Sequence, residues 1–262
     1  MASFNKRLRV FAGPNGSGKS TVIDSIRQKK VGERTIDFGI YINADDIAAA
    51  LRSDNFCFSS YQLPPFSRSD FIDMALATGL ISDVTFPEVE FRKSFSLNQA
   101  GEFRLKAKLW HENLAQILAA VIRERLLVLE RKISFETVFS HESKLDFMAR
   151  ARDQGYRIYL YFIATKSPEI NIARIKEVRI KQGGHDVPEE KIRGRYQRSM
   201  DLLFDAAELA YQAYFFDNSV NGAKQGLEPF AHFKVIQEKK SWDKINAQDV
   251  PDWFYRYYLT KT

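Results

Sequence analysis

The chain has 262 residues, of which 45% are hydrophobic and 27% charged, as in an ordinary soluble globular protein. Its net charge of +6 is spread along the chain, which favours a solvated surface over a nucleic-acid-binding one. Cys57 is the single cysteine, so an intramolecular disulfide is excluded, and a small apolar role suits it better than that of a nucleophile. No apolar run approaches the ~18 residues of a membrane span and no secretory segment precedes the first strand pattern, so we expect a cytoplasmic protein without membrane contact.

Strand and helix patterns alternate along the chain, which predicts an α/β fold with a parallel sheet and helices on its faces. The first half is expected to form a strand at 7–12, a helix from 19 to about 30, a strand at 38–43, a short helix at 47–51 and an amphipathic helix at 110–130. The second half is expected to form a strand at 133–137, a helix at 142–154, a strand at 156–164, helices at 168–183 and 188–211, and a last core strand at 214–217.

Two regions fall outside this alternation. Residues 52–109 are rich in Ser, Phe and Pro and are interpreted as an insertion after the second strand. Residues 222–262 form a C-terminal extension that ends in an aromatic tail from Trp253 to Tyr258. The rings of this tail could stack on nucleic-acid bases, but their spacing favours packing on the core. We therefore predict a single domain over 1–262, with these two additions.

The strand at 7–12 leads into Gly-Pro-Asn-Gly-Ser-Gly-Lys-Ser, a complete Walker A pattern between a strand and a helix. Its glycines let backbone N–H groups point inward, where a phosphate can sit on them and on the N-terminus of the helix. Lys19 is expected to reach the β- and γ-phosphates, and Ser20 to ligate Mg²⁺. We therefore predict a P-loop NTPase three-layer sandwich with ATP and Mg²⁺ as cofactors. The expected ATP-binding residues are Gly13, Pro14, Asn15, Gly16, Ser17, Gly18, Lys19, Ser20 and Thr21.

Polar residues follow two more strands, at the edge of the sheet where the Walker A loop is expected to lie. Asp45 and Asp46 come after the second strand. Such a carboxylate can accept a proton from an acceptor hydroxyl, hold a Mg²⁺-bound water or cap a helix, and an adjacent pair can divide these tasks. Glu136 and Thr137 end the strand at 133–137, and they are candidates for substrate contact or plain surface residues.

An arginine-rich stretch around a Gly-Gly-His-Asp-Val-Pro segment predicts a helical lid over the nucleotide. Its cations would neutralise the charge that develops on a transferred phosphoryl group. A solvated charged helix face is the alternative for any one of them. His185 is interpreted as a turn residue rather than a base. The arginines of this stretch are Arg174, Arg179, Arg193, Arg195 and Arg198.

Five motifs in this order resemble the zeta-toxin-like P-loop kinases, over about 7–51 and 110–220. They are Gly-Pro-Asn-Gly-Ser-Gly-Lys-Ser-Thr at 13–21, Asn-Ala-Asp-Asp-Ile-Ala at 43–48, Ser-Phe-Glu-Thr-Val-Phe-Ser at 134–140, Gly-His-Asp-Val-Pro-Glu-Glu at 184–190 and Phe-Asp-Asn-Ser at 216–219. The resemblance implies transfer of the ATP γ-phosphate to a hydroxyl of a nucleotide sugar. In the family's toxins that acceptor is UDP-N-acetylglucosamine, and an antitoxin protein is the partner that holds them inactive.

The resemblance also implies roles for particular residues. Asp45 matches the base that acts on the sugar hydroxyl, and Glu136 with Thr137 matches the acceptor-site pair. Asn218 is expected near the adenine edge. Lys19 and Ser20 match the phosphate and Mg²⁺ residues, and by placement the lid arginines are Arg179 with Arg193 or Arg195.

Two other functions remain as alternatives to a small-molecule kinase. One is a partner-dependent P-loop ATPase, because the Walker A loop looks like that of ABC domains. The chain has no Leu-Ser-Gly-Gly-Gln-like signature and no apolar run ending in Asp-Glu, which argues against this class. The other is a polynucleotide kinase, favoured only by the net charge and the aromatic tail.

Overall fold

A computed structural model describes residues 6–106, 109–182, 188–220, 228–245 and 250–262, with only the backbone described at 31, 178–182 and 244. The chain forms two compact units. The first unit joins Met1–Phe38 to Glu136–Thr262, and the second unit is Gly39–Phe135. The predicted insertion at 52–109 lies wholly inside the second unit.

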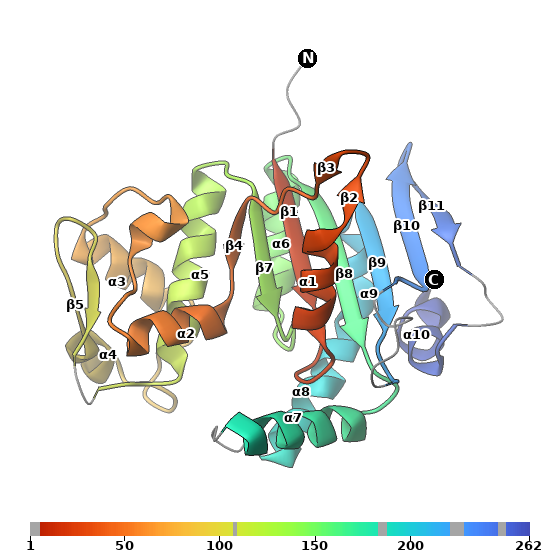
Figure 1. The fold of residues 1–262 in the computed structure, drawn as a ribbon. Helices are drawn as coiled ribbons and strands as arrows, with labels where there is room; N and C mark the ends of the chain where they lie inside the picture. Colours follow the sequence, from red (N-terminus) through yellow and green to blue (C-terminus); the bar gives the residue numbers. More distant parts are fainter. Residues whose placement is uncertain (1–5, 107–108, 183–187, 221–227, 246–249) are drawn as a thin grey trace. The chain divides into compact units, whose positions relative to one another are not determined.

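The sheet of the first unit has the strand order β11-β10-β9-β8-β1 (Figure 1). Its parallel part is β1 (Arg7–Ala12), β8 (Arg157–Ala164) and β9 (Gln212–Asp217). These strands confirm the predicted parallel α/β core. The prediction that the sheet ends at residue 217 is wrong, because β10 (Ala231–Ile236) and β11 (Lys239–Lys244) extend it in antiparallel fashion.

The turn between β10 and β11 explains why this hairpin escaped the sequence analysis. Gln237 and Glu238 both have positive φ, at 49° and 64°. Two-residue hairpin turns with two positive φ values usually carry Asn-Gly or Asp-Gly, which are the sequence signals for such a turn. Two long polar residues give no such signal, so the turn is imposed by the pairing of the strands it joins.

Helices cover both faces of this sheet, as a three-layer sandwich requires. In Figure 1, α1 (Lys19–Gln28) lies in front of the strands, with α6 (Ser143–Asp153) and α9 (Leu203–Glu208) behind them. The single helix predicted at 188–211 is two helices, α8 (Glu189–Asp201) and α9, separated at Leu202. The remaining elements of this unit are β2 (Lys30–Val31), β3 (Arg34–Thr35), α7 (Pro168–Gln182), α10 (Asp252–Tyr257) and η3 (Leu259–Lys261).

The aromatic tail packs on the sheet, which was the favoured reading of its spacing. Phe254 and Tyr258 are fully buried, and their ring centroids lie 4.7 and 5.3 Å from that of Phe215 in β9. Trp242 of β11 stands edge-on to both, at 6.4 and 5.9 Å. Tyr255 points outward, with 60% of its surface exposed, and Tyr257 is half-buried. The tail therefore adds apolar area to the core beside the added strands, and Phe254 and Tyr258 are not available for stacking on bases.

The second unit begins with a parallel pair of strands. β4 (Ile40–Ile42) pairs with β7 (Ile133–Thr137), and α2 (Ala44–Arg52) follows β4 directly. The long helix predicted at 110–130 is α5 (Asn113–Val128). The insertion consists of short pieces, none longer than nine residues: η1 (Phe58–Tyr61), α3 (Arg68–Leu76), α4 (Glu88–Ser94), β5 (Phe95–Leu97) and β6 (Phe103–Leu105).

A cluster of phenylalanines holds these short pieces together. Phe71 is fully buried, and its ring lies within 5.1–6.3 Å of five neighbouring rings: Phe58, Phe66, Phe91, Phe95 and Phe103. Aromatic rings each bury a large apolar area, so a few of them can stabilise elements too short to be stable alone. In the described part of the chain, no helix combines the length and apolarity needed to cross a bilayer.

We expect Phe71→Ala to destabilise the second unit by about 3–5 kcal/mol, since it opens a cavity at the centre of this cluster. Val84→Ala is the matched control, because Val84 is 95% exposed. Urea unfolding followed by circular dichroism measures both losses. A loss at Phe71 no larger than that at Val84 would contradict the idea that the ring cluster is the core of this unit.

Candidate functional site

The Walker A loop connects β1 to α1 in the first unit and is packed against backbone on two sides. A Cβ atom added at Gly13 would lie 2.0 Å from the carbonyl oxygen of Ile163, at the end of β8. One added at Gly16 would lie 2.7 Å from the carbonyl oxygen of Asn171, in α7. Gly16 also has a φ of +75°, which residues with a side chain rarely adopt. The loop can therefore occupy this place only with glycine at these positions.

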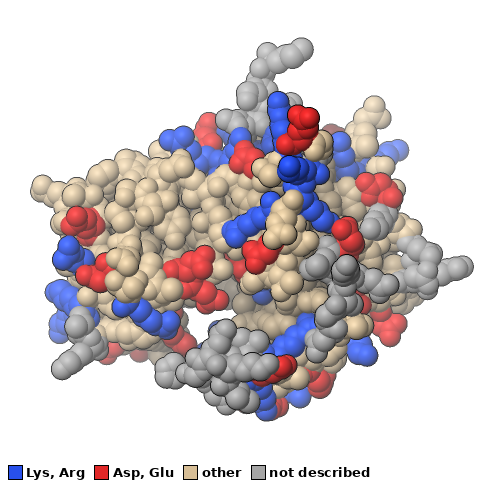
Figure 2. Space-filling model, viewed as in Figure 1, with Lys and Arg blue, Asp and Glu red and all other residues tan. Residues whose placement is uncertain are grey.

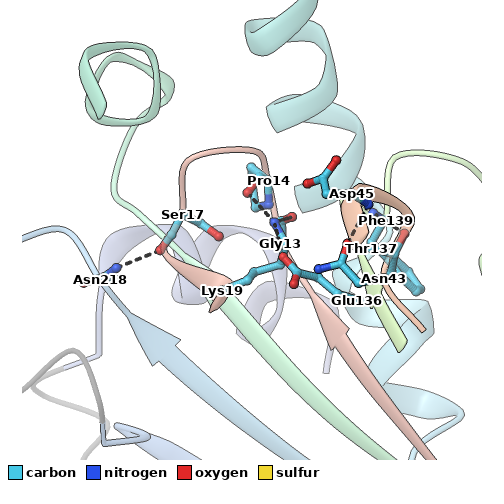
Figure 3. A network of polar contacts seen from close by, with 10 residues as sticks. All are labelled: Gly13, Pro14, Ser17, Lys19, Asn43, Asp45, Glu136, Thr137, Phe139 and Asn218. Carbon is cyan, nitrogen blue, oxygen red and sulfur yellow. Dashed lines mark hydrogen bonds and ion pairs between the residues drawn. The ribbon is translucent and has the colours of Figure 1, made fainter. Parts of the chain in front are cut away.

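Lys19 is buried and folds its ammonium group back over the loop (Figure 3). Its Nζ donates hydrogen bonds to the carbonyl oxygens of Gly13 and Pro14, each at 3.0 Å, and lies 3.9 Å from Oε1 of Glu136. Ser20 follows in the first turn of α1 and is exposed. The loop thus holds a positive charge through two of its carbonyl groups, and a hydroxyl-bearing residue follows in the chain, which suits the binding of a phosphate with its metal ion.

The N-terminus of α1 is open to an anion. Its N-cap is Gly18, which has no side chain to bond the first N–H groups of the helix. Asn218, after β9, donates from Nδ2 to the carbonyl oxygen of Ser17 at 2.8 Å (Figure 3). The side chain of Asn218 therefore braces the loop just before the helix begins, and the N–H groups remain directed toward the position a phosphate would take.

The other side of the loop is supported by Arg174 of α7, one of the arginines of the predicted lid, and by Thr165 and Asn171, which were not predicted from the sequence. Arg174 donates from Nη1 to the carbonyl oxygen of Gly16 at 3.4 Å, and burial lowers its pKa from the usual value. Thr165 and Asn171 are fully buried and joined by a side-chain hydrogen bond of 2.5 Å. The sequence signal that could have pointed to Thr165 is its position directly after the apolar strand β8, because ligands bind at the carboxyl ends of parallel strands.

Glu136 and Thr137 are the last two residues of β7, and their side chains make different contacts. The Glu136 carboxylate is 12% exposed and faces the Lys19 ammonium, so the structure brings it to the Walker A loop as expected. Oγ1 of Thr137 accepts a hydrogen bond from the N–H of Phe139 at 3.1 Å. Phe139 has a φ of +58°, so the hydroxyl of Thr137 stabilises a tight turn at the end of the strand.

The predicted lid corresponds to α7 and α8, which an ion-pair network joins. Arg193 pairs with Glu169 and lies 4.0 Å from Glu189, which also pairs with Lys176. Arg195 is half-buried on α8. For Arg179 only the backbone in α7 is described, and His185 lies outside the described residues.

In the second unit, Asn43 caps α2. Its Oδ1 accepts a hydrogen bond from the N–H of Asp45 at 2.8 Å (Figure 3). The expectation that one of the two aspartates serves as the cap is therefore wrong. Among the described residues, the Asp45 side chain has no hydrogen bond or ion pair, so it is available to a ligand. Burial together with the charge of Asp46 raises the pKa of Tyr61 to about 12.

The residues present fit Mg²⁺ in the way that nucleotide-binding proteins hold it. Within the described ranges, no three His, Cys, Asp or Glu side chains come together as a metal cage. Mg²⁺ keeps several waters and is usually held by one or two side chains plus the phosphates of the nucleotide. Ser20, which follows Lys19 and is exposed, has the hydroxyl that would hold such an ion, and the Glu136 carboxylate lies 3.9 Å from the Lys19 ammonium.

Comparison with known proteins gives partial similarities. No family profile matches the chain. An uncharacterized protein of Haemophilus influenzae is 38% identical over 61 residues, which is 23% of this chain and 43% of that protein. Of the solved structures, one of the PezAT toxin–antitoxin system of Streptococcus pneumoniae is similar over 99% of this chain and 80% of its own, at 14% identity and a TM-score of 0.46. A structure of AvrRxo1-ORF1 and AvrRxo1-ORF2 with ATP is similar over 91% of this chain and 61% of its own, at 13% identity and a TM-score of 0.47.

We expect Gly16→Ala to destabilise the protein by more than the roughly 1–2 kcal/mol of left-handed backbone strain, because its Cβ would also meet backbone of α7. Gly155→Ala is the matched control: its φ is +84°, but an added Cβ has no neighbour within 4 Å. Equal losses for the two variants in denaturant unfolding would contradict the tight fit of the loop.

The ion pairs between α7 and α8 predict that the protein loses stability at acid pH. Hydrogen bonds from Ser167 and Arg193 lower the pKa of Glu169 from 4.5 to about 2. Because the folded pKa is depressed, the stabilisation is present above pH 4.5 and is lost as the pH falls toward 2. Glu169→Gln should flatten the fall of Tm in this window, and Glu33→Gln, which changes an exposed carboxylate, should not. The same pH profile for wild type and Glu169→Gln would contradict the network.

Proposed function

We propose that the chain is an ATP-dependent kinase of the zeta-toxin type, which transfers the γ-phosphate of ATP to a hydroxyl of a nucleotide-sugar-like acceptor. The observation that carries the proposal is the Walker A loop. Its backbone is fixed at Gly13 and Gly16, Lys19 lies over it, and the uncapped N-terminus of α1 begins at its end. These are the parts a protein needs to hold a nucleoside triphosphate for phosphoryl transfer.

In this proposal, two side chains and the backbone N–H groups of the loop bind the phosphates and Mg²⁺. Lys19 neutralises the β- and γ-phosphates, and the Ser20 hydroxyl ligates Mg²⁺, which when bound draws negative charge from the phosphate oxygens. The N–H groups of residues 16–21 surround the phosphates. Asn218 braces Ser17, and it is proposed to lie near the adenine edge of the nucleotide.

The arginines of α7 and α8 are proposed to stabilise the charge on the transferred group. To the predicted Arg179, Arg193 and Arg195 we add Arg174, because its guanidinium already touches the loop at Gly16. Arg193 is bonded to Glu169, so its first task is to hold α7 against α8. An arginine that neutralises the transition state can be worth several orders of magnitude in rate.

Asp45 is proposed as the base that accepts the proton of the acceptor hydroxyl, with Glu136 and Thr137 as acceptor contacts. Three features support this assignment. Asp45 follows a strand that is parallel to β7, its carboxylate has no partner among the described residues, and the helix cap is supplied by Asn43 instead. A base must be within reach of the proton it takes, and an uncommitted carboxylate can accept one.

The acceptor is proposed to be a small molecule rather than a polynucleotide. On the described part of the face in Figure 2, acidic and basic side chains are interspersed rather than gathered into one basic surface. A polynucleotide kinase would need a positive groove along its substrate. UDP-N-acetylglucosamine is the first acceptor to test, and an antitoxin is the protein partner that a toxic activity of this kind would require.

We expect Lys19→Ala to abolish ATP turnover, because it removes the phosphate-facing charge. Asp45→Asn should leave ATP binding intact and lower the transfer rate by about 10²-fold or more. Asp54→Asn, an exposed carboxylate in the same unit, is the control and should keep full activity. The assay is ³¹P NMR or mass spectrometry of the purified protein with ATP, Mg²⁺ and a panel of UDP-sugars.

The outcomes separate the parts of the proposal. A phosphorylated UDP-sugar made by wild type and lost in Asp45→Asn supports the kinase and its base. Full transfer by Asp45→Asn would overturn the assignment of the base. ATP hydrolysis without any phosphorylated sugar would overturn the acceptor class, and the partner-dependent ATPase would then be tested with cell extract.

A further inference from the structure

A cavity lies in the first unit, at the N-terminus of α7 and between α8 and α10. Its volume is 440 Å³, which is within the range of small-molecule sites. Its walls come from the loop after β8 and from the three helices, and none of its lining residues belongs to the Walker A loop. Of its lining residues, the proposed function uses only Arg193 of α8.

Two buried rings line the cavity, Tyr196 of α8 and Trp253 of α10. The Tyr196 hydroxyl donates to the carbonyl oxygen of Thr165 at 2.6 Å, and Nε1 of Trp253 donates to Oδ1 of Asp217 at 3.4 Å. The polar atoms of both rings are already bonded, and only 5% and 3% of their surfaces are exposed, so a ligand would meet an apolar edge of each. Tyr257 adds a third ring, whose hydroxyl donates to Gln197 at 3.2 Å.

The charged residues around these rings are mainly basic. Lys166, Arg193 and Arg256 line the cavity together with one carboxylate, Asp252. Arg193 is already paired with Glu169. Among the described residues, Lys166 and Arg256 have no carboxylate within 4 Å of their cationic groups. Both are exposed, so two cations next to an aromatic surface remain available to an anion.

We propose that this cavity binds a small molecule that joins a planar ring to a phosphate or carboxylate group, the chemistry of a mononucleotide. The ring packs on Tyr257, which is half-buried, and against the exposed edges of Tyr196 and Trp253, since aromatic surfaces attract planar rings with little regard to their identity. The anionic group is held by Lys166 and Arg256 through charge-assisted hydrogen bonds. Neither interaction requires the kinase activity, so this proposal is independent of the proposed function.

The test is isothermal titration calorimetry of the full chain with UMP, AMP, benzoate and inorganic phosphate. Each titration is made on the free protein and on protein saturated with a non-hydrolysable ATP analogue and Mg²⁺. The test variant is Lys166→Glu/Arg256→Glu. The matched control is Arg34→Glu/Lys239→Glu, which makes the same change in net charge at exposed residues away from the cavity.

We expect at least one ring-bearing anion to bind the analogue-saturated protein more tightly than inorganic phosphate does. The test variant should weaken that binding by about tenfold or more, and the control should leave it unchanged. Absence of binding at about 1 mM ligand, or unchanged binding in the test variant, would overturn the proposal. Loss of binding on saturation with the analogue would also overturn it, because the cavity would then belong to the ATP site. If the analogue itself fails to bind, the proposed function fails while the titration of the free protein still tests the cavity.

Discussion

The Walker A loop is held by backbone that comes too close for any side chain. At Gly13 the end of β8 is the neighbour, and at Gly16 it is the first half of α7. Protein interiors tolerate few voids and few overlaps, so this contact fixes where the loop lies relative to the sheet and to α7. The ammonium of Lys19, the N-terminus of α1 and the hydroxyl of Ser20 take their places from it.

The same contact connects the candidate site to the rest of the first unit. Thr165 lies between β8 and α7, and its side chain bonds to Asn171 while its carbonyl oxygen accepts the hydroxyl of Tyr196 from α8. At the end of β9, Asp217 accepts a hydrogen bond from Nε1 of Trp253, and the next residue, Asn218, donates one to the loop. Buried polar groups are costly unless they are bonded, so these residues commit α7, α8 and α10 to one arrangement around the loop. The cavity proposed as a second site lies within this arrangement.

The second unit is stabilised differently, by the packing of aromatic rings. Its insertion consists of elements of nine residues or fewer, which could not be stable in isolation. Buried phenylalanines around Phe71 supply the apolar area that such elements lack. Asp45 stands at the start of α2 in this unit, where Asn43 takes the capping role and leaves the aspartate to other chemistry. Asn43 therefore leaves the Asp45 carboxylate free of a capping role.

Local sequence pattern was enough to predict several elements of the fold. β1 and β7 were predicted with their observed bounds, and β8, α1 and α5 within a few residues, because long apolar strands and helical periodicity are local signals. The glycine spacing and Lys19 placed the loop for the same reason. Only the tertiary structure decided the rest. Strands β10 and β11 depend on a turn without turn residues, and the break at Leu202 carries no glycine or proline. The contact of Arg174 with Gly16 and the cavity between α8 and α10 join residues far apart in the chain, which no local pattern encodes.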